Sequence, residues 1–251
     1  MPTIRPNRYL RALAAVALGG SLASGLIGAP AALSAPSETG AGLAITPLRV
    51  EIDDTNRGAT VMLTNTSVRD LPVQTRLFAW SQAQGEDVYA PSTDLTISPS
   101  IASIPPGETQ IVRVLRSGPA APGEKRYRLI VDQLPDPTLE KNGEAEARIR
   151  FSLPVFLDRS KAAPTQLDWR IGANGIELAN TGGATARIVQ IEVKTAAGTP
   201  VPVERNTLRY VLGNSTIAWP LGNACSIGPV KVTASIDGRT VDAEPRSTCS
   251  G

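Results

Sequence analysis

The sequence predicts an all-β protein built from two immunoglobulin-like sandwiches. Short runs of alternating apolar and polar residues recur along the chain, and this period-two pattern is typical of half-buried strands. Glycine and proline number 22 and 21 in 251 residues, which indicates many turns between short elements. No segment shows a convincing amphipathic helix, a heptad pattern or an internal repeat.

Residues 1–35 have the three parts of a secretory signal peptide. Residues 1–11 contain three arginines, residues 12–27 contain no charge, and small residues then precede Ala31 and Ala35. We therefore predict export and cleavage between about Ala31 and Ala35. An uncleaved membrane anchor is the alternative.

Seven candidate strands follow the signal peptide, separated by turn-forming residues such as those of 53–58 and 105–108. Seven short strands within one domain are typical of an immunoglobulin-like sandwich. The predicted strands are 43–52, 59–63, 72–80, 95–98, 109–115, 126–134 and 145–157.

A short polar stretch at 158–164 that ends in proline marks a boundary between domains. A second series of strands follows it, and Asp237-Gly238 predicts a hairpin near its end. We therefore expect an N-terminal domain over 36–160 and a C-terminal domain over 161–251. The second series is 167–171, 175–178, 186–194, 207–212, 215–219, 230–236 and 239–243.

Cys225 and Cys249 are the only two cysteines. In an exported protein such a pair is most simply a disulfide. A redox-active pair is the alternative, although redox pairs usually have C-x-x-C spacing.

Several functional classes lack the residues that they need. The chain has no histidine, which excludes histidine triads and histidine metal sites. Residues 1–35 hold three of the 25 basic residues and none of the 23 acidic ones, so the remainder has a net charge of −1 and no basic cluster for nucleic acid. Asp53-Asp54 and the pair Glu144 and Glu146 fit solvated turns and strand ends better than a calcium or catalytic site. We expect no enzyme, cofactor, metal or small-molecule substrate.

The predicted strand at 145–157 is long for a domain of this kind, since strands usually have 5–6 residues. Its odd-numbered residues are apolar and share one face. A long apolar strand at a sheet edge invites aggregation unless something covers it. An ordinary core strand with Pro154 at a bulge is the alternative.

Four segments, in this order, resemble the periplasmic pilus (fimbrial) assembly chaperones of Gram-negative bacteria, the PapD-like family. Ile45–Val50 resembles its first strand with an arginine, and Ile97–Val114 resembles its P-x-hydrophobic…P-G-x-x-Q-x-h-R stretch. Glu124–Pro135 and Ile149–Phe156 resemble its last two strands of the first domain. Departures from the usual pattern indicate a divergent branch.

The resemblance implies two immunoglobulin-like domains in an L or boomerang arrangement and a periplasmic chaperone for pilus subunits. Such a chaperone donates its long edge strand to an incomplete subunit and delivers the subunit to an outer-membrane usher. A secreted immunoglobulin-like structural protein, such as a pilus subunit itself, is the alternative function. The donor residues implied by register are Ala145, Ala147, Ile149, Phe151 and Leu153.

The resemblance also implies an anchor for the carboxylate at the C-terminus of the subunit. Arg49 matches the arginine of this anchor, but Pro154 stands where the family has a lysine, so Arg150 is the expected substitute. Glu124 matches an acidic residue with a structural role near the domain interface, and Arg159 is its expected partner.

Overall fold

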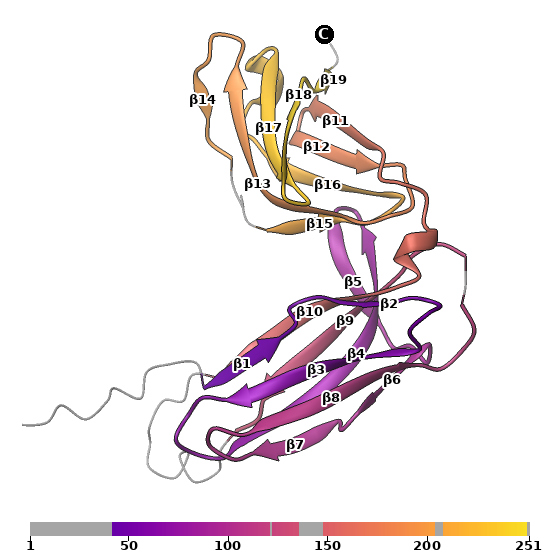
Figure 1. Ribbon diagram of the computed structural model, residues 1–251. Helices are drawn as coiled ribbons and strands as arrows, with labels where there is room; N and C mark the ends of the chain where they lie inside the picture. The colour runs from indigo at the N-terminus through magenta and orange to yellow at the C-terminus, as the bar shows by residue number, and fades with distance from the viewer. Residues whose placement is uncertain (1–41, 121, 136–147, 204–207, 250–251) are drawn as a thin grey trace, which may run out of the picture. The chain divides into compact units, whose positions relative to one another are not determined.

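The computed structural model describes residues 42–120, 122–135, 148–203 and 208–249 (Figure 1). These residues belong to one compact unit, Glu38–Gly251. The predicted signal peptide, with Ala31 and Ala35, lies outside the described residues, as do Ala145 and Ala147.

Strands β1 to β10 form two sheets that face each other across one core. One sheet has the order β1-β3-β8-β6, and the other has the order β2-β10-β9-β4-β5, with β7 also paired to β4. The strands are β1 (Leu43–Thr46), β2 (Val50–Ile52), β3 (Gly58–Asn65), β4 (Leu71–Ala83), β5 (Glu86–Ala90), β6 (Leu95–Ser98), β7 (Ile101–Ile104), β8 (Thr109–Arg116), β9 (Lys125–Gln133) and β10 (Arg150–Leu157).

Alternation along each strand produces the core of this first sandwich. In β3, Val61 and Leu63 are fully buried, whereas Met62 between them is exposed. Leu129 in β9 and Val155 in β10 contribute to the same core from the opposite sheet. The period-two pattern therefore identified the inward face of these strands correctly.

The predicted strand 43–52 is two strands in the structure, and they belong to different sheets. β1 pairs with β3, whereas β2 pairs in parallel with β10. Pro47 lies in the gap and has no N–H for a ladder hydrogen bond. The chain thus leaves one sheet after Thr46 and joins the other at Val50.

The predicted strand 145–157 also needs correction, because β10 begins only at Arg150. Arg148 and Ile149 lie outside the strand, although the Gln133 amide still donates to the Ile149 carbonyl at 3.0 Å. The partner strand β9 ends at Gln133, and the Leu134 amide that follows donates to the Pro72 carbonyl on the β4 side at 2.8 Å. The ladder between β9 and β10 therefore ends where β9 ends.

Four short strands were not predicted: β5, β7, and two of the second sandwich, β14 and β19. In β5 all five residues are exposed, so it carries no apolar face for periodicity to reveal. It forms only because the long strand β4 offers a free edge to pair with.

The strands that follow form a second sandwich around a separate core. One sheet has the order β16-β12-β11-β19, and the other has the order β14-β13-β17-β18, with β15 also paired to β13. The strands are β11 (Leu167–Gly172), β12 (Gly175–Asn180), β13 (Ala186–Thr195), β14 (Pro200–Val201), β15 (Arg209–Val211), β16 (Ser215–Pro220), β17 (Val230–Ile236), β18 (Arg239–Ala243) and β19 (Arg246–Ser247).

Two local features of the second sandwich follow from the sequence. Trp169 and Trp219 stack in the core with ring centroids 5.7 Å apart. Asp237 and Gly238, both with positive φ, form the predicted hairpin turn between β17 and β18. The fold class is confirmed, since both halves are antiparallel-rich sandwiches.

Two 3₁₀ turns are the helical elements of the described residues, η1 (Arg159–Lys161) and η2 (Ala224–Ser226). Neither they nor any other helix in the described ranges has the length and apolar character to cross a membrane. η1 lies within the predicted boundary at 158–164.

A buried carboxylate joins the two sandwiches. The Glu124 side chain is completely buried and accepts hydrogen bonds from the Thr185 amide at 3.0 Å and from the Thr185 hydroxyl. Arg126 Nε donates to it at 2.9 Å, and Arg159 donates to its second oxygen. Arg159 also donates to the Thr185 carbonyl at 2.7 Å. One carboxylate thus holds together residues of both sandwiches.

An aromatic cluster provides a second connection. Trp80 and Phe156 of the first sandwich pack against Tyr210 and Leu212 of the second. The rings of Trp80 and Tyr210 meet edge to face, with centroids 5.3 Å apart. Beside them, Gln82 accepts from the Leu212 amide at 3.0 Å and donates to the Tyr210 carbonyl at 2.8 Å.

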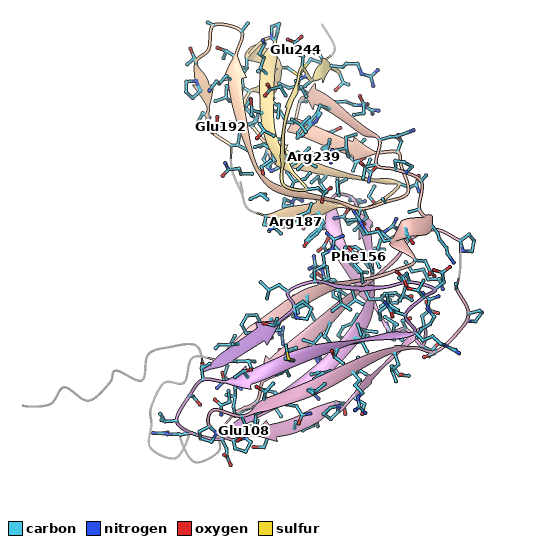
Figure 2. All side chains as sticks on the ribbon, viewed as in Figure 1. Glu108, Phe156, Arg187, Glu192, Arg239 and Glu244 are labelled. Carbon is cyan, nitrogen blue, oxygen red and sulfur yellow. A yellow bond between two sulfur atoms is a disulfide. The ribbon has the colours of Figure 1, made fainter. Side chains whose placement is uncertain are left out.

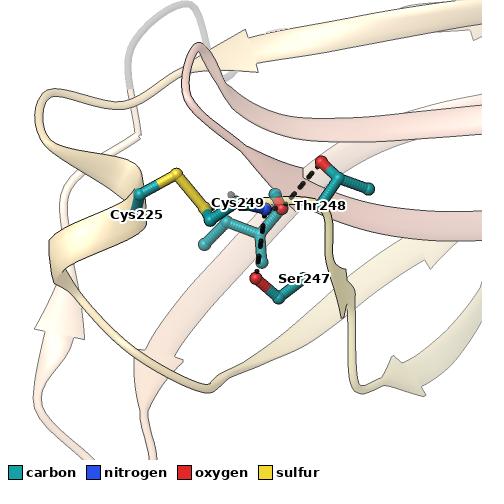
Figure 3. The surroundings of a disulfide bond; sticks show 5 residues. Cys225, Ser247, Thr248 and Cys249 are labelled. Carbon is teal, nitrogen blue, oxygen red and sulfur yellow. Dashed lines mark hydrogen bonds between the residues drawn. A yellow bond between two sulfur atoms is a disulfide. The ribbon is translucent and has the colours of Figure 1, made fainter. Parts of the chain in front are cut away.

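The predicted disulfide between Cys225 and Cys249 is present (Figure 3). It joins η2 to the segment after β19, whose Thr248 amide donates to the Ile171 carbonyl at 2.8 Å. The bond therefore holds the C-terminal segment beside β11, whose edge β19 covers.

We predict that Cys225→Ser lowers the free energy of unfolding by about 3 kcal/mol, because the unfolded chain loses a closed loop of about 25 residues. Urea denaturation with and without reductant measures this. Reductant should destabilise the wild type by the same amount and leave the variant unchanged. Equal stability of variant and oxidised wild type would contradict the prediction.

We predict that Glu124→Gln lowers the free energy of unfolding by about 3 kcal/mol, because Arg126 and Arg159 lose a buried counter-charge. Glu244→Gln is the matched control, since Glu244 is 79% exposed and pairs with Lys231 at 3.7 Å. The control should change stability by less than about 1 kcal/mol. Similar urea midpoints for the two variants would show that the Glu124 network stabilises nothing.

Candidate functional site

The first half of β10 has an unpaired edge. β9 pairs with β10 along its whole length, from Arg150 to Leu157, but β2 pairs only with Val155–Leu157 on the other side. Among the described residues no strand pairs with Arg150–Pro154 on that side. The sheet therefore ends in a step, where backbone groups of β10 are open to another strand.

The backbone hydrogen bonds show which residues face this open side. The Ile149 carbonyl accepts from β9, and the Asp158 amide donates to Ile52 on the β2 side. Because backbone groups alternate in an antiparallel ladder, Arg150 and Ser152 direct their backbone groups toward the open edge. Pro154 also faces it, so its missing N–H removes no hydrogen bond to β9.

The predicted donor side chains differ in their exposure. Ile149 and Phe151 are partly buried, and Phe151 packs against the core of the first sandwich. Leu153 is only 2% exposed, because it lies within that core. The structure thus leaves Ile149 and Phe151 accessible at the open edge but not Leu153.

A pocket lies where the open edge meets the start of β2. Of the described residues that line it, three are arginines and none is acidic. They come from both sandwiches: Leu48, Arg49, Arg128, Phe151, Ser152, Leu153, Pro154, Arg187, Leu208 and Tyr210. The pocket therefore combines apolar walls with three guanidinium groups, a combination that suits an anion attached to an apolar chain.

Arg49 lies at the junction of edge and pocket. It directly precedes β2, whose register places it beside Pro154. Its guanidinium is 4.9 Å from the Phe156 ring centroid and donates to Glu51, and its side chain is 34% exposed. Arg49 is thus held in place yet accessible.

The structure does not bring Arg150 to Arg49. Arg150 is four positions from Pro154 along β10, a distance of about 13 Å. It pairs instead with Asp132, to which Arg76 also donates at 2.7 Å. Burial of Asp132 opposes its ionisation, but the hydrogen bonds from Arg150 and Arg76 outweigh this and lower its pKa. Arg150 is therefore not among the described residues that line the pocket with Arg49, and its expected role in place of the lysine stays a prediction.

Two pocket arginines were missed by the sequence analysis. Arg128 lies opposite Pro154 in the ladder between β9 and β10, and Arg187 is on β13 of the second sandwich (Figure 2). An arginine between Tyr127 and Leu129 was the only available indication for Arg128, and nothing local distinguished Arg187. Glu124 and Arg159 lie outside the pocket, in the connection between the sandwiches described above.

The described residues of the site provide groups that can bind another chain. Among the described residues no group of three potential ligands could hold a metal ion. What the site offers is an open strand edge that ends at a cationic pocket.

A comparison with protein-family models matches residues 42–161 to the N-terminal PapD domain of pili and flagellar-assembly chaperones. This range includes the open edge and the first-sandwich side of the pocket. No curated protein matches the chain significantly.

Solved structures with the same fold are found among pilus chaperones. A chain of the CsuC–CsuE chaperone–tip adhesion subunit complex from archaic Csu pili of Acinetobacter baumannii has 24% identity and a TM-score of 0.65, with 83% of this chain and 100% of that chain covered. The chaperone DraB of E. coli has 17% identity and a TM-score of 0.56 (81% and 98% covered). A chain of the SafA pilin–SafB chaperone complex of Salmonella enterica has 15% identity and a TM-score of 0.57 (80% and 95% covered).

At these identities the structural likeness establishes the fold, and the match over residues 42–161 supplies the family. The structural likeness agrees with the two sandwiches. The N-terminal sandwich, over residues 42–161, belongs to the PapD-like family of pili and flagellar-assembly chaperones.

Proposed function

We propose that this protein is a periplasmic chaperone that captures pilus subunits at the open edge of β10 and delivers them to an outer-membrane usher. The observation that carries the proposal is the unpaired side of Arg150–Pro154 next to a pocket with three arginines. An extended segment can add to such an edge, because backbone hydrogen bonds provide affinity and alternate side chains fill pockets in the partner.

The donor residues of this proposal are Ile149 and Phe151, preceded by Ala145 and Ala147. Ile149 and Phe151 are only partly buried at the start of β10, and Ala145 and Ala147, which precede them in the sequence, lie outside the described residues. A subunit that lacks one strand would cover this face and remove the aggregation hazard of an open apolar edge. Leu153 remains in the chaperone's own core and is not proposed as a donor.

The pocket fits the end of the captured chain. A strand added at the open edge would lie beside β10 in line with β2. Arg49 lies at the start of β2, where that position beside β10 is already occupied. The subunit must therefore end there, and a terminal carboxylate matches the two-point hydrogen bonding of a guanidinium. With its C-terminus at Arg49, the added strand runs parallel to β10, as β2 does.

Two structures of the same fold support this class of partner. CsuC is seen with a tip adhesion subunit, and SafB is seen with the SafA pilin. Release to an usher needs no nucleotide, since a subunit groove that the chaperone fills loosely can be filled better by the next subunit. The N-terminal segment, which resembles a signal peptide, supports a periplasmic location.

We predict that Ile149→Asp reduces recovered chaperone–subunit complex to about a tenth or less, because a carboxylate in an apolar groove loses its hydration without a partner. The test is co-expression with the pilus subunit encoded beside this chaperone, followed by affinity purification from periplasm.

Ile111→Asp is the matched control for this experiment. Ile111 lies on the outer face of β8, is 48% exposed, and is far from the open edge in the sheet order. It should leave capture unchanged. Normal complex with Ile149→Asp, in a protein that is as stable as the control, would overturn donation by this face.

We predict that Arg49→Ala also reduces capture about tenfold or more, because the pocket loses the guanidinium at the start of β2 that would bind the end of the added strand. Arg49→Lys should give an intermediate yield, since it keeps the charge but not the fork. Thermal unfolding of the free variants shows whether loss of the contact with Phe156 affects the fold. Full capture by a folded Arg49→Ala protein would exclude this anchor.

A further inference from the structure

A charged cluster lies on the outer face of the first sandwich, at the end of the open edge that is remote from the pocket. Arg150 on β10 is directly opposite Asp132 on β9, and its Nε donates to one oxygen of the Asp132 carboxylate. Arg76 on β4, the strand on the other side of β9, donates to the second oxygen at 2.7 Å. One carboxylate thus holds two guanidinium groups, and we call these three residues the Asp132 cluster.

The cluster has one positive charge in excess, because two arginines share one aspartate. The described residues next to it on the same face of β4, β9 and β10 are uncharged: Gln74, Ile130 and Ser152. Arg148, which precedes β10, is exposed and adds a further cation. Within the described part of the chain, this end of the open edge is therefore positive.

Arg150 is the member of the cluster that can bind a partner. Both oxygens of Asp132 already accept hydrogen bonds, and its side chain is only 13% exposed. The Arg150 side chain is 67% exposed and donates to Asp132 through Nε, and a guanidinium has several other N–H donors. Because Asp132 already holds the guanidinium in place, a second acceptor would bind it at a lower cost in side-chain entropy.

The register places Arg150 beside the strand that the open edge would receive. Neighbouring strands lie about 4.8 Å apart, so an added strand brings one of its side chains next to Arg150 on the outer face. Opposite charges in such a cross-strand pair stabilise it, and like charges destabilise it. The added strand runs parallel to β10 and ends before Arg49, beside Pro154. Arg150 is four positions before Pro154, so its neighbour is about two to four positions before the last residue of the added strand.

We propose that Arg150, held in place by Asp132, selects captured chains that have an acidic side chain about two to four residues before their C-terminus. This inference rests on the proposed function and adds a requirement on the sequence of the subunit. It is separate from the binding of the end of the chain, because the arginines that line the pocket are Arg49, Arg128 and Arg187. A lysine or arginine at the same place in the subunit would meet a like charge.

The probes are synthetic peptides that copy the last ten residues of the pilus subunit encoded beside this chaperone. Glu, Gln or Lys replaces, in turn, the second, third or fourth residue before the last one. Fluorescence anisotropy at low salt measures the affinity of the full-length mature chaperone for each peptide. At one position the wild type should bind the Glu peptide about two- to fivefold more tightly than the Gln peptide, and the Lys peptide most weakly. The immediate neighbours of that position should show no such order, because consecutive residues of a strand face opposite sides.

Charge reversal at Arg150 tests whether this residue causes the preference. Arg150→Glu should make the Lys peptide the tightest binder at the same position, and Arg150→Gln should remove the preference. Arg113→Glu is the matched control, because Arg113 is an exposed arginine in β8 of the opposite sheet and the substitution changes the net charge equally. The control should keep the wild-type order. Sodium chloride at about 1 M should weaken the preference of the wild type, since it screens exposed charges.

Equal affinities of the wild type for the Glu and Lys peptides at all three positions would overturn the inference, as would the same preference at every position. Retention of the wild-type order by folded Arg150→Glu or Arg150→Gln would overturn it as well. If no peptide binds, the same substitutions in the whole subunit, with recovered complex as the measure, decide the comparison. Failure of the wild type to capture the unaltered subunit in co-expression is the separate result that would overturn the proposed function itself.

Discussion

The short length of β2 determines how the first sandwich can interact with a partner. β2 pairs with only three residues of β10, whereas β9 pairs with eight. The five residues Arg150–Pro154 therefore have hydrogen-bonding groups that no described strand uses on one side. Unsatisfied strand edges attract other strands, and a folded protein retains one only if something covers it. The apolar face of this segment and the pocket at its end can contact a partner strand because of that step.

The break at Pro47 is the physical origin of the step. The chain pairs first with β3 in one sheet and then crosses to pair with β10 in the other. This crossing places Arg49 at the start of β2, so its position relative to the open edge follows from the strand switch. A single continuous strand from 43 to 52 would leave Arg49 within one sheet. It would not leave the edge of β10 open up to Pro154.

The contacts between the sandwiches position the rest of the pocket. Tyr210, Leu208 and Arg187 reach it from the second sandwich. Glu124, bonded to Thr185 and Arg159, and the cluster around Trp80 hold that sandwich against the first. A buried charge network stabilises only when every partner is present, so its loss should affect the pocket as well as the fold. The pocket and the connection are thus one structural unit, although they share no residue except Tyr210.

Much of the strand pattern could be predicted from the residues, because burial of one strand face leaves a period-two signature. β6, β17 and β18 have the predicted limits, and the disulfide followed from two cysteines in a chain expected to be exported. The strands that were missed, such as β5, have no buried face and form by pairing with an existing edge. Arg49 was found as a candidate by resemblance to a motif in consecutive residues.

Other features depend on which strands become neighbours, and no local pattern encodes that. Arg150 was expected beside Arg49 because it lies on the same face of β10, but register places it about 13 Å from Pro154 along the strand. Arg128 faces Pro154 only because β9 and β10 pair in this register, and Arg187 reaches the pocket only because the second sandwich packs there. Alternation along the chain decides which residues face inward. Pairing between distant segments decides which charges meet, because it depends on contacts across the whole sheet and on the packing of the second sandwich.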